Sequence, residues 1–336
     1  MQGDSGYAEM RRLIVGHAVT IAISAVATLR IADHLAQGPK DTAELAQLTG
    51  TNEGFLRRVL GYLASEGVFA ALEDDRFALT ERSHWLRSDV PGSLHARAAF
   101  TGSRVSWTGW GHLLESLRNG ESAMRIAFGQ SLFDYLKTAP DAATFNAFMA
   151  GQTAASTAAL LAAHDFTGSR EIVDVGGGHG ALLAGILRAH GNARGILFDT
   201  PEVIATAKPL LERAGVAERC RLVGGDFFAD VPGDADLYLL KFILHDWADA
   251  ECVRILRNCR QAMAPGGRVL IVEHLLSDGR GPDFARFMDV NMMVFTSGGE
   301  RTQAEFESLL DAAGLRLCAV VPTSIGLHAL ECAAHA

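Results

Sequence analysis

A histidine and three carboxylates stand near the ends of predicted strands, where they could move a proton. His245 follows the apolar run 236–241 and precedes Asp246, while Glu273 ends a later apolar run and Glu300 lies in a glycine-containing segment. The unperturbed pKa of imidazole is about 6.5, so a histidine suits the removal of a proton from a phenol whose pKa is about 10. Glu273 and Glu300 are both candidates to accept a hydrogen bond from the second ring nitrogen and so fix the tautomer.

Two other histidines compete with His245 for the role of general base. His274 lies at the same predicted strand end as Glu273, and His179 lies inside a glycine-rich turn. A single histidine is more often a hydrogen-bonded core or surface residue than a catalytic group. We expect His179 to be only a turn residue of a ligand-binding loop, and we take His245 as the base.

The segment 171–187 combines a buried strand, a glycine turn and an apolar helix, which is how a nucleotide-binding α/β unit begins. Its turn, 174–180, reads DVGGGHG, which fits neither the G-x-G-x-x-G of dinucleotide-binding folds nor the P-loop. Asp174 would repel a pyrophosphate but could hold an ammonium group. The turn alone is weak support for a ligand site, because many such turns only tighten a corner between strand and helix.

Acids also end the next two predicted strands. Asp199 ends the strand that begins near residue 195, and Asp226 and Phe227 close the third strand. An acid about 20 residues beyond the glycine turn is where a carboxylate binds a ribose diol in open α/β folds. Asp226 could accept a hydrogen bond from an adenine amino group, and Phe227 could cover the ring. These residues would share one edge of the sheet, so we expect a ligand with an adenosine and an amino-acid tail, S-adenosylmethionine.

The composition is that of a globular protein. The chain has 336 residues, of which 49% are hydrophobic and 21% charged, which suggests two domains with ample core. A net charge of −9 makes nucleic acid and anionic membranes unexpected partners. Five cysteines without a C-x-x-C pair argue against a disulfide framework and a structural zinc site, and fit a reducing cytoplasm. We expect no signal peptide, and we interpret the apolar stretch 14–31 as a buried helix pair, not a membrane span.

Residues 1–90 are predicted to form a winged-helix-like domain. Its expected elements are three helical segments and a β-hairpin: 8–37, 42–50, 53–66 capped by Asn52, and the pair 67–69 with 76–80. A winged helix often reads DNA, so a transcription regulator is one alternative. The predicted wing tip, 73–75, is Glu-Asp-Asp and would repel phosphate, so we expect a dimerisation domain instead.

The rest of the chain is predicted to be a helical linker, 91–165, followed by an α/β domain, 166–336. The linker is rich in Ala, Phe, Trp and Met, and some of its aromatic residues could line a flat apolar pocket. The α/β domain alternates five strands with helices, and its helix 250–263 is predicted to end at the Ala-Pro-Gly-Gly segment 264–267. It finishes in a predicted antiparallel hairpin of the strands 315–321 and 325–331. Thr302 and Glu305 form a predicted capping box at its last helix. We expect a Rossmann-like doubly wound sheet of the class I methyltransferase type.

At this point the sequence resembles a known family. The segments DVGGGHG, FDTPEVI, GGDFF, LKFILHDW, APGGRVLIVEHLL and GGERTQAEFESLL are similar to those of S-adenosylmethionine-dependent O-methyltransferases of the caffeate and hydroxyindole type. Bacterial members of this family modify natural products, including antibiotics. The N-terminal segment also resembles the family's dimerisation domain, so the resemblance covers nearly the whole chain. It implies a cytoplasmic homodimer with an aromatic small-molecule acceptor.

The resemblance implies roles for individual residues. His245 would be the general base, flanked by Asp246 and oriented by Glu273 and Glu300. The residues implied to contact the cofactor are Gly176, Gly178, Asp199, Asp226, Phe227, Lys241 and Trp247. The residues implied to line the acceptor site are Phe145, Met149, Met288, Asn291 and Met292. No metal is implied, because this type uses a histidine where the smaller catechol-type enzymes use magnesium.

One alternative keeps the fold and the cofactor but not the methyl transfer. Some relatives use the bound cofactor structurally in hydroxylation, decarboxylation or cyclisation. The set His245, Glu273 and Glu300 argues against this alternative, because it supplies the base that in-line methyl transfer to a hydroxyl needs. We therefore expect an O-methyltransferase.

Overall fold

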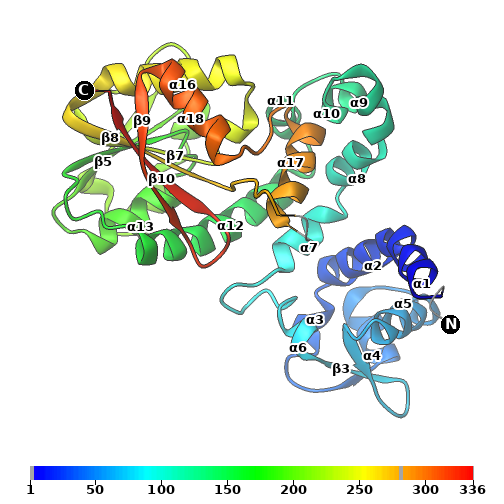
Figure 1. The fold of residues 1–336 in the computed structure, drawn as a ribbon. Coiled ribbons are helices and arrows are strands. Elements are labelled where there is room, and N and C mark those ends of the chain that lie inside the picture. The colour runs from blue at the N-terminus through cyan, green and yellow to red at the C-terminus, as the bar shows by residue number, and fades with distance from the viewer. Residues whose placement is uncertain (1–3, 280–282, 336) are drawn as a thin grey trace. The chain divides into compact units, whose positions relative to one another are not determined.

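The structure is a computed structural model, and it describes residues 4–279 and 283–335. The chain divides into two compact units (Figure 1). The first contains residues 1–111 and 133–151, and the second contains residues 112–132 and 152–336. The helical segment predicted at 91–165 is thus shared between the two units, because its helices pack with different neighbours.

The first unit begins with a winged-helix arrangement. Its first elements are α1 (Asp4–Ile14), α2 (Gly16–Thr28), α3 (Ile31–His34), α4 (Thr42–Thr49) and α5 (Glu53–Ser65), then β2 (Phe69–Ala71) and β3 (Arg76–Leu79). The Asn52 side chain accepts a hydrogen bond from the N–H of Phe55, and Gly50 ends α4 with φ of 66°. A short strand that the sequence did not predict, β1 (Lys40–Asp41), pairs with β3 and completes a three-stranded sheet.

The first unit is completed by short helices and half of a long one. These elements are α6 (Glu81–His84), α7 (His95–Thr101), α8 (Arg104–Gly111), α11 (Leu132–Leu136) and the N-terminal part of α12 (Ala142–Ala163). Aromatic rings join α7 to α12, since Phe100 stacks on Phe148 with centroids 5.3 Å apart and meets Phe145 edge-on at 5.4 Å. Phe145 and Phe148 are among the linker aromatics that the sequence predicted as core or pocket residues.

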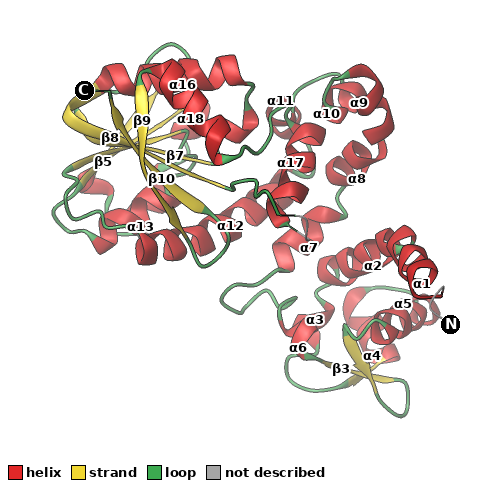
Figure 2. Cartoon of the chain, in the orientation of Figure 1, coloured by secondary structure: helices red, strands yellow, loops and turns green. Residues whose placement is uncertain are grey.

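The second unit contains a central sheet (Figure 2). Its seven strands are hydrogen-bonded in the order β6-β5-β4-β7-β8-β10-β9. Its strands are β4 (Glu171–Val175), β5 (Arg194–Asp199), β6 (Cys220–Gly224), β7 (Ala235–Lys241), β8 (Met263–Glu273), β9 (Leu315–Pro322) and β10 (His328–Ala334). The first five are parallel to one another, and β10 runs antiparallel to both β8 and β9. This is the doubly wound sheet with a terminal hairpin that the sequence predicted.

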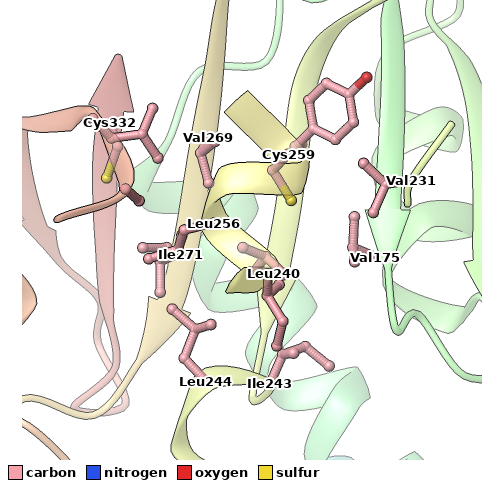
Figure 3. Close-up of a cluster of buried hydrophobic side chains, with 14 of the residues drawn as sticks. Val175, Val231, Leu240, Ile243, Leu244, Leu256, Cys259, Val269, Ile271 and Cys332 are labelled. Carbon is pink, nitrogen blue, oxygen red and sulfur yellow. The ribbon is translucent and has the colours of Figure 1, made fainter. Parts of the chain in front are cut away.

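Helices cover both faces of this sheet, α12 and α13 (Ala181–Ala189) on one face and α16 (Asp249–Ala262) and α18 (Gln303–Ala313) on the other (Figure 1). Each face has its own core. Under α16, Leu256 and Cys259 pack on Val269 and Ile271 of β8 (Figure 3). The other helices of the unit are α9 (Leu113–Asn119), α10 (Ala123–Phe128), α14 (Pro201–Ile204), α15 (Lys208–Arg213), α17 (Phe284–Phe295) and the 3₁₀ helices η1 (Ala217–Arg219) and η2 (Leu244–Asp246).

Several predicted boundaries move in the structure. Strand β8 already begins at Met263, so the Ala-Pro-Gly-Gly segment predicted as a helix end is part of the strand. Strand β10 begins at His328 instead of residue 325, because residues 323–327 form the hairpin turn. The predicted capping box is confirmed, since Thr302 and Glu305 exchange both hydrogen bonds at the start of α18.

Within residues 4–279 and 283–335 no single helix has the length and apolar composition to cross a membrane. Only α1 and α2 taken together pass that test of length and composition, and they are bent by 43° at their junction.

Candidate active site

The candidate site is built where the parallel strands end. The carboxyl ends of β4, β5, β6, β7 and β8 meet at one edge of the sheet, because these strands are parallel and hydrogen-bonded in register. The loops that leave them carry the glycine turn 176–180, Asp199, Asp226 and the segment 241–247. Ligands bind at this edge in open α/β folds.

The glycine turn is closed on one side and open on the other. Gly176 has φ of 67°, and a β-carbon there would lie 2.5 Å from Ile243 Cδ1. Gly178 also has a left-handed backbone, with φ of 59°, but a β-carbon there would meet nothing within 4 Å. The turn therefore presses against the segment after β7 at Gly176 and presents open space at Gly178, as a loop that receives a ligand must.

Asp199, at the end of β5, holds this turn. Its Oδ2 accepts a hydrogen bond from the N–H of Gly178 at 2.8 Å, and its Oδ1 accepts one from the N–H of Thr200 at 2.7 Å. Asp226 lies two residues beyond β6 and accepts a hydrogen bond from the N–H of Phe228 at 2.9 Å. The predicted acids thus lie at successive strand ends, and their side chains order the loops that carry them.

A cluster of three aromatic side chains lies beside the glycine turn. The rings of Phe227 and Trp247 have centroids 6.0 Å apart, and Phe228 packs edge-on against both. Phe227 Cε1 would lie 3.6 Å from a β-carbon at Gly176. Asn258 fixes this loop by donating its side-chain N–H to the carbonyl of Phe227 at 2.8 Å. The structure thus brings Gly176, Phe227 and Trp247 together.

Asp174 is buried beneath the turn, and the charge of the half-buried Lys241 acts on it. Burial raises the pKa of Asp174 to about 7, although the charge of Lys241 acts in the opposite direction. Burial likewise lowers the pKa of Lys241 to about 8, against the attraction of Asp174 and Glu273. Asp174 Oδ2 has no hydrogen-bond partner among the described residues, so it could accept a bond from a ligand. The Lys241 ammonium group lies 4.3 Å from the centroid of the Phe242 ring and donates to Thr153 Oγ1 at 3.4 Å.

His245 lies in the 3₁₀ turn after β7 and is 6% exposed. Its Nδ1 donates a hydrogen bond to Glu300 Oε1 at 2.9 Å, which assigns the proton of the neutral ring to Nδ1 and leaves the lone pair on Nε2. The nearest carboxylate oxygen to Nε2 in a charge pair is Asp246 Oδ1, at 3.9 Å. The ring stacks on Phe242 with an interplanar angle of 13°.

Glu273 holds the backbone of this turn rather than the imidazole ring. Its Oε1 accepts hydrogen bonds from the N–H groups of Ile243, Leu244 and His245 at 3.1, 2.7 and 3.3 Å. The sequence left Glu273 and Glu300 as equal candidates to bind the ring nitrogen. In the structure Glu300 makes that contact, and Glu273 places the turn.

The pKa values of His245, Glu273 and Asp246 are raised in this cluster. Burial lowers the pKa of His245, but the charges of Glu273 and Asp246 and the hydrogen bond to Glu300 outweigh burial and raise it to about 9. Burial raises the pKa of Glu273 to about 7 and that of Asp246 to about 6. The cluster therefore binds protons more tightly than its members would alone.

The same residues are the one set among the described residues with the chemistry of a metal site. His245, Glu273 and Glu300 each offer a ligand atom, and these atoms lie within 4.8 Å of one another. Glu273 Oε1 and Glu300 Oε1 already accept N–H donors, whereas both Oε2 atoms are buried without a partner among the described residues. The site could thus take up positive charge, either protons or a cation.

The predicted acceptor residues fall in both compact units. Met288 and Met292 are buried on α17 and Asn291 is half-buried, all in the second unit. Phe145 and Met149 lie on the part of α12 that belongs to the first unit.

A hollow of about 480 Å³ in the second unit lies beside His274 and is also lined by Leu275, Ile325 and His328. None of the predicted acceptor residues lines it. His274 Nδ1 donates to the carbonyl of Gly326 at 3.1 Å, and burial lowers its pKa. The other rival, His179, is exposed.

Sequence reasoning missed two residues that shape the site. Arg301 is buried and donates hydrogen bonds to the carbonyls of Leu244 and Trp247. Phe242 has φ of 57°, a rare conformation for a bulky residue, and packs beneath the His245 ring. Arg301 directly follows Glu300 in the segment that was quoted for the resemblance, but no spacing rule connects it to a turn more than fifty residues earlier.

The assignment of the ring contact to Glu300 predicts a change in the titration of His245. In the variant Glu300→Gln the pKa of His245 should fall from about 9 toward the unperturbed value of about 6.5, because a hydrogen-bonded negative charge is lost. Histidine ¹³C–¹H NMR of the two proteins would measure it. Glu305→Gln, at the cap of α18, is the control. An unchanged pKa in Glu300→Gln would contradict the contact.

Comparisons with known proteins agree with this geometry. Residues 110–316 match the O-methyltransferase domain family, and residues 11–89 match the O-methyltransferase dimerisation domain. The chain is 42% identical to a phenazine O-methyltransferase of Lysobacter antibioticus, over 95% of this chain and 94% of that protein.

Two solved structures are similar over nearly the whole chain. The structure of a mitomycin 7-O-methyltransferase superposes with a TM-score of 0.92 at 35% identity, covering 99% of this chain and 98% of the other. An O-methyltransferase from neocarzinostatin biosynthesis, solved with S-adenosylmethionine and 2-hydroxy-5-methyl naphthoic acid, superposes with a TM-score of 0.83 at 32% identity, covering 95% and 96%. The predicted family, fold class and cofactor are confirmed by these matches, and nothing in them supports the non-methylating alternative. The chain belongs to the O-methyltransferase family and is an S-adenosylmethionine-dependent methyltransferase.

Proposed function

We propose that this enzyme methylates a hydroxyl group of an aromatic small molecule and that His245 is the general base. The observation that carries the proposal is the buried imidazole whose Nδ1 is held by Glu300 at 2.9 Å, so that Nε2 carries the lone pair. S-adenosylmethionine supplies an electrophilic methyl group when it is bound. The residues of the chain must then bind the two substrates, align them and remove one proton.

The proton affinity of His245 suits a phenol. The acidic neighbours of His245 raise its pKa toward the value of about 10 for an unperturbed phenol, which reduces the free-energy cost of proton transfer, and the neutral ring that accepts the proton becomes more populated as the pH rises. The neutral ring accepts the proton at Nε2. Glu300, on Nδ1, then stabilises the resulting imidazolium, as a carboxylate does in other histidine-based sites.

The cofactor residues fit S-adenosylmethionine in kind and position. The open space at Gly178 and the unpartnered Asp174 Oδ2 would receive the amino-acid part, and Asp199 would bind the ribose. Asp226 and the ring of Phe227 would hold the adenine, with Lys241 and Trp247 completing the walls. We propose these roles from the arrangement of the strand ends.

The acceptor is proposed from the lining residues and from relatives. Met288, Asn291 and Met292 on α17 offer apolar and polarizable contacts to a flat ring system. The similar proteins are named for phenazine and mitomycin chemistry, and one was solved with a naphthoic acid. We therefore propose an aromatic acceptor that belongs to antibiotic or other secondary metabolism.

The base assignment predicts a selective loss of turnover. His245→Ala should lower kcat by about 10²–10⁴-fold, because general-base catalysis contributes about that much. Binding of S-adenosylhomocysteine to this variant, measured by calorimetry, should persist. In the wild type, EDTA should leave the rate unchanged if the cluster of His245, Glu273 and Glu300 holds protons and no metal. The measurement is methyl gain on hydroxyarenes by mass spectrometry, with His179→Ala as control. Unchanged turnover in His245→Ala would remove the base assignment, and a methyl gain on nitrogen would remove the hydroxyl.

The cofactor assignment predicts a selective loss of affinity. Asp199→Ala should weaken S-adenosylhomocysteine binding by about tenfold or more, because a charged hydrogen-bond acceptor is lost and the N–H of Gly178 is left without its partner. Asp230→Ala removes an exposed carboxylate from the loop after β6 and should bind as the wild type does. Equal affinities for the two variants, measured by titration calorimetry, would contradict the ribose site.

The dimerisation domain predicts a homodimer, for which α1 carries a suitable surface. Tyr7, Met10, Leu13 and Ile14 lie at helical spacing on α1 and are 56–71% exposed, which is unusual for large apolar side chains. The double variant Met10→Lys and Leu13→Lys should shift the protein toward monomers in light scattering. Glu9→Lys, on the same helix, is the control. A double variant that remains dimeric would place the interface elsewhere.

A further inference from the structure

The backbone turn that carries His245 needs hydrogen-bond partners on two sides. Its N–H groups, from Ile243 to His245, point at Glu273 Oε1. Its carbonyl groups at Leu244 and Trp247 flank the histidine in the sequence, before and after it. The carbonyl of Leu244 also accepts the N–H of Trp247 at 3.2 Å, but that bond lies within the turn, so a partner from outside is needed to fix the turn against the rest of the unit.

A single guanidinium group binds both carbonyls. Arg301 Nη1 donates to the carbonyl of Leu244 at 3.0 Å, and Arg301 Nη2 donates to the carbonyl of Trp247 at 2.8 Å. The thiol of Cys252 adds weaker contacts to the same two oxygens, at 3.2 and 3.5 Å. One rigid, planar side chain therefore joins the residues before and after His245 in this turn.

Arg301 is itself fixed in place. Its Nε and Nη2 donate to Asp249 Oδ1 at 3.0 and 2.8 Å, and Arg301 is only 7% exposed. Its backbone carbonyl accepts a hydrogen bond from the N–H of Leu276 at 2.9 Å, which ties it to the segment after β8. The guanidinium group of Arg301 thus has a defined orientation relative to the sheet. A lysine, with one compact ammonium group, could not donate to both carbonyls in this planar geometry.

The segment before Arg301 lies directly against the turn. A β-carbon at Gly298 would fall 2.0 Å from the carbonyl oxygen of His245, so only glycine fits there. Ser297 adopts φ of 82°, which turns the chain into this close approach. Glu300 then reaches the imidazole and Arg301 reaches the backbone carbonyls, so two consecutive side chains hold the ring and the turn of the same histidine.

We propose that Arg301 is a positioning residue for the general base: its guanidinium group fixes the carbonyls of Leu244 and Trp247 and thereby the direction in which His245 Nε2 points. The inference rests on the proposed role of His245. It assigns Arg301 no contact with either substrate. Its effect should be much larger in the chemical step and in the titration of His245 than in cofactor affinity, because it binds only the backbone carbonyl of Trp247, whose ring packs against Phe227 and Phe228.

The test compares Arg301→Lys with the wild type and with Arg257→Lys. Arg257 also donates two N–H groups to a backbone carbonyl, that of Ala312, but it lies on the exposed side of α16 and makes no contact with the turn. Arg301→Lys should lower kcat by about 10- to 100-fold, the cost of a base displaced by about 1 Å. The dissociation constant of S-adenosylhomocysteine should stay within about twofold, and the NMR titration of His245 should shift. Arg257→Lys should change none of these quantities.

Each other result overturns the proposal. A wild-type kcat in Arg301→Lys would show that the planar guanidinium group is not needed to position His245. A variant that no longer folds, or that loses S-adenosylhomocysteine binding together with activity, would assign Arg301 to the general stability of the unit. His245→Ala separates this inference from the proposed function: if that variant keeps its turnover the base assignment fails, whereas if it is inactive and Arg301→Lys is active only the positioning role fails.

Discussion

The pairing of one buried backbone turn, residues 243–247, is the constraint on which the candidate site depends. Glu273 takes its N–H groups, and Arg301 takes its carbonyls. Unpaired, these groups would each cost roughly 1–3 kcal/mol of stability inside the protein. The partners that satisfy them are charged, and they bring a carboxylate and a guanidinium group into the interior beside an imidazole. The raised pKa values follow from the same arrangement: burial raises the pKa of Glu273, whereas the negative charges around His245 raise the pKa of the imidazole against the opposing effect of burial.

The sheet explains why residues so distant in sequence meet here. Parallel strands deliver every loop to one edge, so the glycine turn after β4 and the turn after β7 become neighbours although more than sixty positions separate them. Their contact is tight, since a β-carbon at Gly176 would overlap Ile243 Cδ1. The proposed cofactor loop and the proposed base therefore share a boundary.

Much of the fold could be predicted from local patterns, and the site only in part. The apolar runs that precede Asp174, Asp199 and Lys241 mark strands, and Thr302 with Glu305 marks a helix start, because each pattern acts over a few residues. The division of labour between Glu273 and Glu300 was not predictable, since both are acids near the same edge. It depends on which carboxylate faces a backbone turn and which faces a ring, and only tertiary packing decides that.

Phe242 shows how packing also decides backbone conformation. A left-handed φ costs a bulky residue roughly 1–3 kcal/mol, and no sequence rule would place a phenylalanine there. The strain is offset by burial of the ring, which has the Lys241 ammonium group 4.3 Å from its centroid and the His245 ring 5.3 Å away. The reversed φ bends the chain directly after β7. Within five residues it thereby delivers a lysine to the proposed cofactor side and a histidine to the acidic cluster, which an extended continuation of the strand would carry apart.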